Sequence, residues 1–290
     1  IVPVAIITIA IVGVMHLRGV KNAGNFQIIL GGFLLTIFAI FIIRGLTDVN
    51  GFNREIFLSG NVVFEGQTIW QDIGRMLTTI ALTYSAYVGF EVIADDAEEV
   101  SDPNRNIPRG ILLSLLIATV VYTLVALVTI GTIPYDQLAG STTALTDAAA
   151  KFWPNGGVQL MAMAGIVATL TSINSAMLSA TREAYTLSRE KVWPRFLSRL
   201  SRWRTPYTAI FVVVIISALV AAIGVVDLLS FISSTGYLFV LFWASLAMVR
   251  LHKKYPNIER PFKAPFFPLT AYLAAGSAVL IAAFADPKAL

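Results

Sequence analysis

Long apolar runs separated by short polar segments dominate the sequence. A membrane-crossing helix needs about 20 consecutive apolar residues. Of two shorter runs, Ile1–Met15 is cut by the start of the sequence, and Met76–Phe90 lies between Arg75 and Glu91. The latter can cross a bilayer only if a polar helical segment continues it. Six charge-free runs reach about the required length: Phe26–Ile43, Ile111–Pro134, Gly157–Thr181, Pro206–Val226, Leu228–Val249 and Pro265–Ala285.

This pattern predicts an all-α fold, a polytopic membrane helix bundle in a single transmembrane domain over residues 1–290. Because the chain starts inside an apolar run and without Met, we interpret it as a piece of a longer protein, incomplete at the N-terminus and also at the C-terminus. Helices are expected at 1–16, 25–45, 70–100 (broken near 85–89), 108–133, 156–190, 206–225, 227–250 and 266–285.

Composition agrees with a bilayer environment, since 57% of the residues are hydrophobic and only 13% are charged. The formal net charge of +4 does not indicate nucleic-acid binding, because the basic residues lie in short clusters between apolar runs. The absence of Cys excludes disulfides and thiolate metal sites. His16 and His252 both flank apolar runs beside basic residues, so we expect them at the headgroup level and predict no metal site and no catalytic residue.

The distribution of Lys and Arg predicts the orientation. If Met76–Val100 crosses the membrane, the loops after residues 15, 100, 181 and 249 hold 16 of the 21 basic residues, and the opposite side holds five. Cytoplasmic loops carry the excess of positive charge. The four loops are therefore predicted to be cytoplasmic in a multi-pass protein of the cell membrane.

Local signals refine the connections. Asn106 is a predicted N-cap, with Pro108 in the first turn of the following helix. Thr143–Phe152 is expected to form a short external helix. Arg182–Trp203 alternates basic and aromatic residues, as in a helix lying at the membrane interface, and a lipid-facing cytoplasmic loop is favoured there over a partner-binding site.

The stretch from Leu82 to Pro108 carries the strongest functional signal. On a helix, Glu91, Asp95, Glu98 and Asp102 would form one acidic stripe, which is expected to line a hydrated vestibule because embedded carboxylates need water or a partner. The small and β-branched residues at 85–89 also permit a broken helix. Backbone groups freed there would have to face a cavity or a ligand. An unbroken helix containing one Gly is the alternative.

A second polar cluster lies in the run Gly157–Thr181. Thr171, Ser172 and Ser175 fall on nearby helix faces, and either they bond back to their own helix or they line a cation site. Asn174 cannot be satisfied so locally, so we expect it to bond to a neighbouring helix. No nucleophile or metal-ligand set accompanies the acidic residues, which disfavours an enzyme.

These motifs resemble the amino acid–polyamine–organocation transporters. SAYVGFEVIADDAEEVSDPNRNIPRGI is similar to the sixth helix of that family and the loop that follows it. LRGVKNAG resembles the loop before the fifth helix, TSINSAMLSATREAYTLSREKVWPRFLSRL the eighth helix and its extension, and ERPFKAPFFP the loop before the eleventh.

The resemblance implies part of a LeuT-like inverted-repeat fold covering the fourth to eleventh helices, with a discontinuous sixth helix. It implies a permease that carries an amino acid or related organic amine through the lipid bilayer by alternating access, together with missing N-terminal helices of the same protein. The substrate-binding residues it implies are Ser85, Ala86, Tyr87, Val88, Gly89, Phe90 and Glu91, with Tyr87 or Tyr84 as the aromatic residue that closes over the substrate.

One position departs from the family pattern. Proton-coupled members often carry a Lys on the fifth helix, where this chain has GGFLL at Gly31–Leu35. Coupling to H⁺ or Na⁺, as symport or antiport, therefore stays open, and Thr171, Ser172 and Ser175 are the predicted cation positions. The alternative functions are a non-transporting structural or accessory subunit and, less favoured, a membrane enzyme that uses the acidic stripe.

Overall fold

The computed structural model describes residues 2–18, 20–59, 69–90, 92–95, 97, 100–203, 205–223, 226–260 and 262–284, and every regular element within these ranges is helical. The elements are α1 (Val2–Leu17), α2 (Val20–Thr47), α3 (Arg54–Ser59), α4 (Ile69–Tyr84), the 3₁₀ turn η1 (Ser85–Tyr87), α5 (Val92–Asp95), α6 (Pro103–Thr132), α7 (Tyr135–Ala139), α8 (Ala144–Phe152), α9 (Gly157–Arg189), the 3₁₀ turn η2 (Arg195–Ser198), α10 (Tyr207–Ile223), α11 (Val226–Lys254) and α12 (Leu269–Phe284).

Helix lengths match the prediction of a polytopic membrane bundle. Four segments in the described ranges are long and apolar enough to cross a bilayer: Gly24–Thr47, Pro103–Thr132, Gly157–Arg189 and Ile232–Lys254. The helices α1, α10 and α12 are apolar but shorter. The helices expected at 206–225 and 266–285 are α10 and α12, with 17 and 16 residues, and the residues directly after each lie outside the described ranges.

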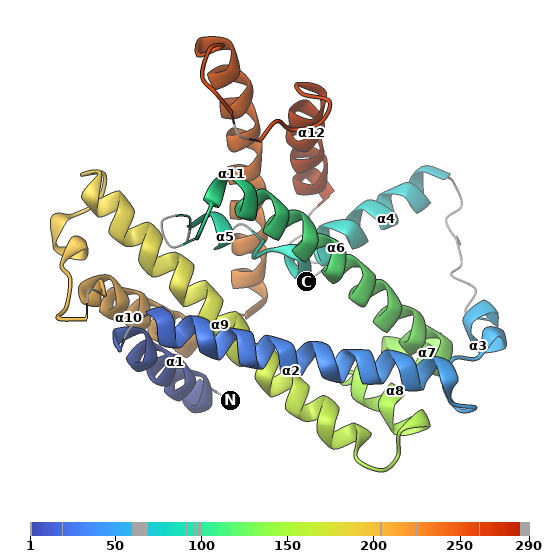
Figure 1. The fold of residues 1–290 in the computed structure, drawn as a ribbon. Helices are drawn as coiled ribbons and strands as arrows, with labels where there is room; N and C mark the ends of the chain where they lie inside the picture. Colours follow the sequence, from blue (N-terminus) through green and yellow to red (C-terminus); the bar gives the residue numbers. More distant parts are fainter. Residues whose placement is uncertain are drawn as a thin grey trace. The chain divides into compact units, whose positions relative to one another are not determined.

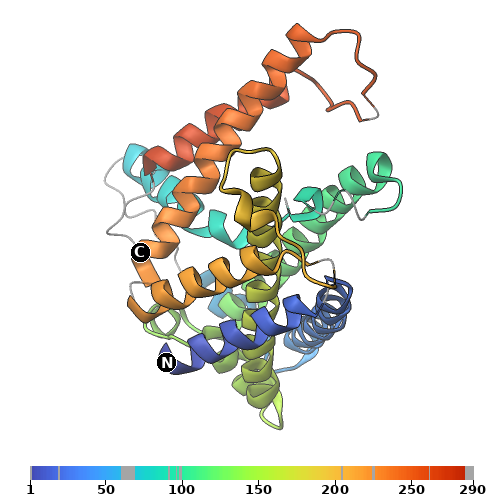
Figure 2. The same cartoon turned by 90° about the vertical axis from the view of Figure 1, so that its left-hand side faces the viewer.

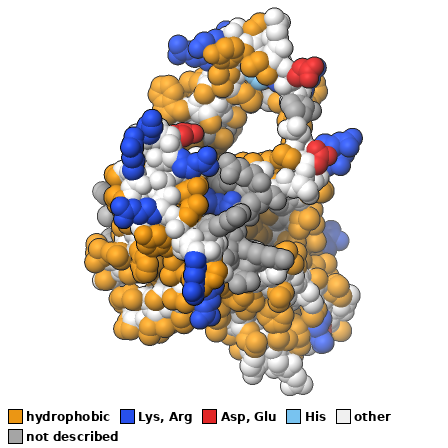
Figure 3. Space-filling view, turned by 60° about the vertical axis from the view of Figure 1, so that its left-hand side comes forward, with side chains coloured by type: hydrophobic (Ala, Val, Ile, Leu, Met, Phe, Trp, Pro, Cys, Tyr) orange, Lys and Arg blue, Asp and Glu red, His pale blue; other side chains and the backbone are white. Residues whose placement is uncertain are grey.

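The surface is also that of a membrane protein. α6 alone exposes Leu112, Leu113, Leu116, Ile117 and Val120 along its length. Apolar side chains cover much of the face shown in Figure 3. A soluble monomer rarely exposes such contiguous apolar area, whereas acyl chains cover it at no cost in hydration.

The chain divides into two compact units, of which the first comprises Ile1–Val63 and Leu116–Ala222. In this unit α2 and α9 lie against each other, and α1 packs on both (Figures 1 and 2). Its core includes Val128 and an edge-to-face pair of Phe41 and Phe152, whose ring centroids are 5.2 Å apart. Close packing of α1 on α10 requires Gly13, since a Cβ there would lie 2.6 Å from Val214 Cγ2.

The second unit comprises Phe64–Leu115 and Ile223–Leu290, so it takes the first residues of α6. α12 packs along α11, and it also contacts α4 (Figure 1). α11 in turn contacts η1. Ile93 of α5 lies against α6, with its Cδ1 atom 3.4 Å from where a Cβ on Gly110 would stand. These contacts place the segment after α4 among three helices of the same unit.

One helix start differs from the sequence expectation, and one short helix forms where it was expected. α6 begins at Pro103 rather than at Asn106, because the backbone carbonyl of Asp102 accepts from the N–H groups of Arg105 and Asn106, and Pro suits a first helical position. The short helix expected at Thr143–Phe152 is α8.

The interface helix expected through Trp203 ends as α9 at Arg189. Lys191 adopts a left-handed conformation (φ 64°), and the N–H groups of Val192 and Trp193 both bond to the carbonyl of Leu187. This is the hydrogen-bonded cap of a helix C-terminus. Pro194 then prevents any continuation, because it has no N–H to donate.

Candidate functional site

The α-helix is interrupted at the segment for which the sequence permits a break. α4 ends at Tyr84, η1 follows over Ser85–Tyr87, residues 88–90 form a turn, and α5 begins at Val92. The α-helical winding expected of an unbroken crossing is therefore absent between Tyr84 and Val92. In a membrane such a backbone must be enclosed by protein or face a cavity.

Gly89 sets the geometry of this interruption. Its φ is +120°, a conformation that side-chain-bearing L-residues rarely adopt. A Cβ built at this position meets nothing within 4 Å. The requirement for Gly is therefore one of backbone conformation, since the space beside it is open.

The predicted substrate residues differ in their exposure to the surroundings. Ala86 and Gly89 are exposed, whereas Tyr84, Tyr87, Val88 and Phe90 are half-buried. For Ser85 only the backbone is described, and Glu91 lies outside the described residues. The break thus combines two exposed positions, Ala86 and Gly89, with two half-buried tyrosines.

The acidic stripe does not form as one helical face. α5 is a single turn of four residues, and Asp102 has a φ of +48°, which is incompatible with a helix. The expectation fails at Asp102 because the spacing argument assumes a continuous helix from Glu91 onward. Glu98 and Glu99 lie outside the described residues, and for Asp95 only the backbone is described.

The hydroxyl cluster on α9 is partly satisfied by its own helix. Thr171 is buried, and its Oγ1 donates to the carbonyl of Ala168 at 2.9 Å. Ser172 is exposed and Ser175 is half-buried. Thr171 therefore bonds back to its own helix, which is the first of the two alternatives given for this cluster. Ser172 faces away from the buried side of α9 that carries Thr171.

Asn174 bonds across to two neighbouring helices, which confirms the expectation for this residue. Its Oδ1 accepts from Nε2 of His16 on α1 at 3.0 Å, and its Nδ2 donates to Oε1 of Gln27 on α2 at 3.0 Å. His16 is only 2% exposed, so its imidazole is buried against the neighbouring helices. The hydrogen bond to Asn174 on α9 offsets the desolvation cost of burying this imidazole.

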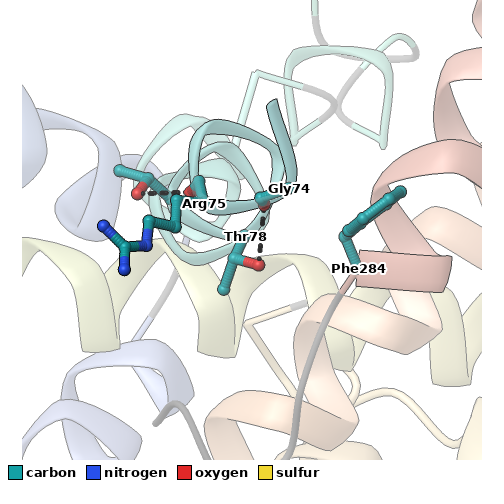
Figure 4. A pocket seen from close by; sticks show the side chains of 5 residues that line it. Gly74, Arg75, Thr78 and Phe284 are labelled. Atoms are coloured by element: carbon teal, nitrogen blue, oxygen red, sulfur yellow. Dashed lines mark hydrogen bonds between the residues drawn. The ribbon is translucent and has the colours of Figure 1, made fainter. Parts of the chain in front are cut away.

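A shallow groove lies between α4 and α12, lined by Gly74, Arg75, Thr78, Thr79 and Phe284 (Figure 4). Thr78 Oγ1 donates to the carbonyl of Gly74 at 3.1 Å, and Thr79 Oγ1 donates to that of Arg75 at 2.9 Å. Both hydroxyls are thus engaged by their own helix. None of the predicted substrate residues lines this groove. Among the described residues, no group of three or more His, Asp or Glu side chains could hold a metal ion.

The comparison with known families decides the classification. A family model described as amino acid permease matches residues 2–289. The chain belongs to the amino acid permease family. This membership confirms the resemblance to amino acid–polyamine–organocation transporters and the prediction of a multi-pass membrane protein.

Curated relatives carry the names of permeases and transporters, not of enzymes. The chain is 28% identical over 277 residues to the branched-chain amino acid permease BcaP of Bacillus subtilis, which covers 94% of this chain and 56% of the relative. It is 28% identical to the methylthioribose transporter of the same organism, over 94% of this chain and 57% of the relative. It is 26% identical to the vacuolar cationic amino acid transporter 4 of Arabidopsis thaliana, over 81% of this chain and 38% of the relative. The chain therefore spans about half the length of the first two relatives.

Sequence reasoning missed two features. The pairing of His16 with Asn174 joins residues 158 positions apart, and no local pattern signals such a contact. The single-turn length of α5 was missed because the acidic residues fit a helical spacing. A signal for the latter was the Ser101-Asp102-Pro103 sequence, since Asp before Pro is typical of a helix start.

Proposed function

We propose that the protein is a secondary active transporter of amino acids or related organic amines that works by alternating access. The observation that carries the proposal is the interruption at residues 85–90 in a chain of the amino acid permease family. Neither an accessory role nor an enzymatic role gains support from the family or its named members.

The substrate would be held by main-chain groups of the break. A zwitterionic amino acid needs donors for its carboxylate and acceptors for its ammonium group, and an irregular backbone offers both within a few residues. Ser85 to Glu91 supply this backbone, and Tyr87 or Tyr84 would close over the bound substrate. Because α5 is one turn long, its dipole adds little, so the contribution expected from a helix N-terminus is small here.

The remaining substrate contacts would come from a first broken helix of the full-length protein, as the family resemblance implies. Tests of transport therefore need the full-length protein. Named relatives act on branched-chain amino acids, methylthioribose or cationic amino acids, and these define the substrate panel.

The deciding experiment is uptake of radiolabelled substrates into liposomes that contain the purified full-length protein. We expect saturable accumulation of at least one amino acid or amine. Failure of every member of the panel, including polyamines, to be taken up or exchanged would contradict the proposal.

Coupling is tested with imposed gradients in the same liposomes. Thr171, Ser172 and Ser175 remain the predicted cation positions, and a sodium gradient should drive uptake if they bind Na⁺. The variant Thr171→Val should then weaken sodium dependence more than Ser172→Ala does. Uptake driven by a proton gradient alone would leave these hydroxyls without a coupling role.

We further propose that the protein lies in the cell membrane with the loops after residues 15, 100, 181 and 249 in the cytoplasm. A hydrogen bond from Thr205 Oγ1 to the carbonyl of Leu17 (3.2 Å) supports a common side for the first and third of these loops. The chain has no Cys, so Ser201→Cys and Thr143→Cys can report sidedness through an impermeant thiol reagent. Only Thr143→Cys should react from outside intact cells.

A further inference from the structure

The segment that joins α9 to α10 presents an unusual combination of exposed side chains. Within residues 190–203, here called the aromatic–basic loop, four cationic side chains and five large apolar ones are exposed. They are Lys191, Arg195, Arg199 and Arg202, with Val192, Trp193, Phe196, Leu200 and Trp203. Between Lys191 and Thr205 the sequence contains no acidic residue. Glu190, at the start of the loop, is its one acidic residue, so four cations against one carboxylate give the loop a net charge of +3.

The first half of the loop is held in place by specific contacts. Ser188 Oγ donates to the carbonyl of Pro194 at 2.8 Å, and Thr208 Oγ1 donates to that of Phe196 at 2.6 Å. Leu197 is 4% exposed and packs against Ala184 of α9 and Ala209 of α10. This buried anchor turns the neighbouring residues Phe196 and Arg195 outward.

The second half is fixed to α1. Ser201 bonds to Thr205 through both backbone and hydroxyl groups (2.8 Å each), and Thr205 Oγ1 donates to the carbonyl of Leu17. The guanidinium of Arg202 lies 4.1 Å from the ring centroid of Trp203. The exposed groups are therefore presented by an ordered backbone, so little backbone entropy remains to be lost on binding.

The position of the loop identifies the environment that these side chains meet. It connects the end of α9, a helix long enough to cross the bilayer, to the start of α10 (Figures 1 and 2). Trp193 and Trp203 are 47% and 50% exposed, and Trp side chains favour the headgroup region of a membrane. Guanidinium groups bind phosphate oxygens with paired hydrogen bonds.

We propose that the aromatic–basic loop is a binding surface for anionic phospholipid headgroups. Its arginines hold the headgroup phosphates, while its aromatic and aliphatic side chains lie among the upper acyl chains. Charge complementarity favours anionic over zwitterionic lipid, because the loop carries four cations and only one acidic residue, Glu190. The surface includes none of the predicted substrate residues, and the proposal does not depend on transport.

The test uses the purified full-length protein in nanodiscs, so it is independent of any transported substrate. Brominated phosphatidylglycerol and brominated phosphatidylcholine are compared as quenchers of Trp fluorescence at equal mole fraction. The contribution of the loop is the Trp fluorescence of the wild type minus that of the variant Trp193→Phe/Trp203→Phe. We expect the anionic lipid to quench this contribution more strongly.

The charge variant is Arg195→Gln/Arg199→Gln/Arg202→Gln, and the matched control Arg250→Gln/Lys253→Gln/Lys254→Gln removes the same charge from the end of α11. A basic residue near an anionic surface contributes roughly a fivefold preference. The loop variant should therefore lose on the order of tenfold or more of the preference for phosphatidylglycerol, and the control should keep it. Gel filtration and circular dichroism confirm that both variants fold.

Three results would overturn the proposal. The first is equal quenching by the two lipids, as expected if the loop binds an acidic protein instead. The second is a loss of lipid preference in the control variant equal to that in the loop variant. The third is abolition of the lipid preference by millimolar glycerol phosphate, which would indicate a site for soluble anions.

Discussion

His16 near the end of α1 donates a hydrogen bond to Asn174 in the middle of the buried face of α9, and the two residues are separated by 158 positions in the chain. Asn174 is 1% exposed and also donates to Gln27 of α2. One amide side chain therefore joins three apolar helices. Inside a membrane, where apolar surfaces gain little by meeting each other, such polar contacts help to fix which helices pair.

Replacing Asn174 should loosen this three-helix contact. Asn174→Leu keeps the approximate volume but leaves His16 and Gln27 without their partner, which costs about 1–2 kcal/mol. Thermal unfolding in detergent should show a lower midpoint. Ser172→Ala, an exposed position on the same helix, is the control and should change little. Equal midpoints for the two variants would show that the hydrogen bonds of Asn174 do not stabilise the protein.

A substitution at Gly89 should impair uptake through the backbone alone. Gly89→Ala adds one methyl group that meets no atom within 4 Å, but its φ of +120° costs an L-residue roughly 1–3 kcal/mol. We expect at least a tenfold lower initial rate of uptake in liposomes, with wild-type expression. Gly276→Ala on α12 also has open space and lies within a helix, so it should keep its activity. Full activity of Gly89→Ala would mean that the break tolerates another geometry.

The hydroxyl of Thr205 should control the order of the aromatic–basic loop. Thr205→Val is nearly isosteric and removes the bonds to Leu17 and to the side chain of Ser201, at a cost of about 1 kcal/mol each. Limited trypsin digestion should then cleave after Arg199 and Arg202 several times faster. Thr169→Val removes a hydroxyl bonded only to its own helix and serves as the control. An unchanged cleavage rate would mean that the loop is held by its other contacts.

The break that follows α4 was predictable because two independent features of the sequence coincide at this segment. An apolar run too short to cross a bilayer lay between Arg75 and Glu91, and small residues interrupted it midway. The φ of Gly89 could not be predicted, since Gly is equally compatible with an α-helix that packs closely. The classification rested on longer motifs and was confirmed by the family match.

Other features depended on contacts that a linear pattern does not contain. The burial of His16 follows from its contact with Asn174, which lies on a helix distant in the sequence. The interface helix expected over Arg182–Trp203 stops at Arg189, because Lys191, rather than Gly or Asn, adopts the left-handed conformation of the cap. Leu197 looked like one of several interfacial apolar residues, yet it alone among them is buried.

Substrate protection of a single cysteine in the break tests the central proposal most directly. Ala86 is exposed beside the interruption, so Ala86→Cys in a full-length protein without other cysteines should react with a small polar thiol reagent. Val49→Cys, at a side chain that is 99% exposed in the other compact unit, is the control. We predict that a transported amino acid slows modification of Ala86→Cys with the same half-maximal concentration that it shows in uptake, and leaves Val49→Cys unaffected. Unchanged modification at Ala86→Cys, in protein that still transports that substrate, would contradict binding at the break.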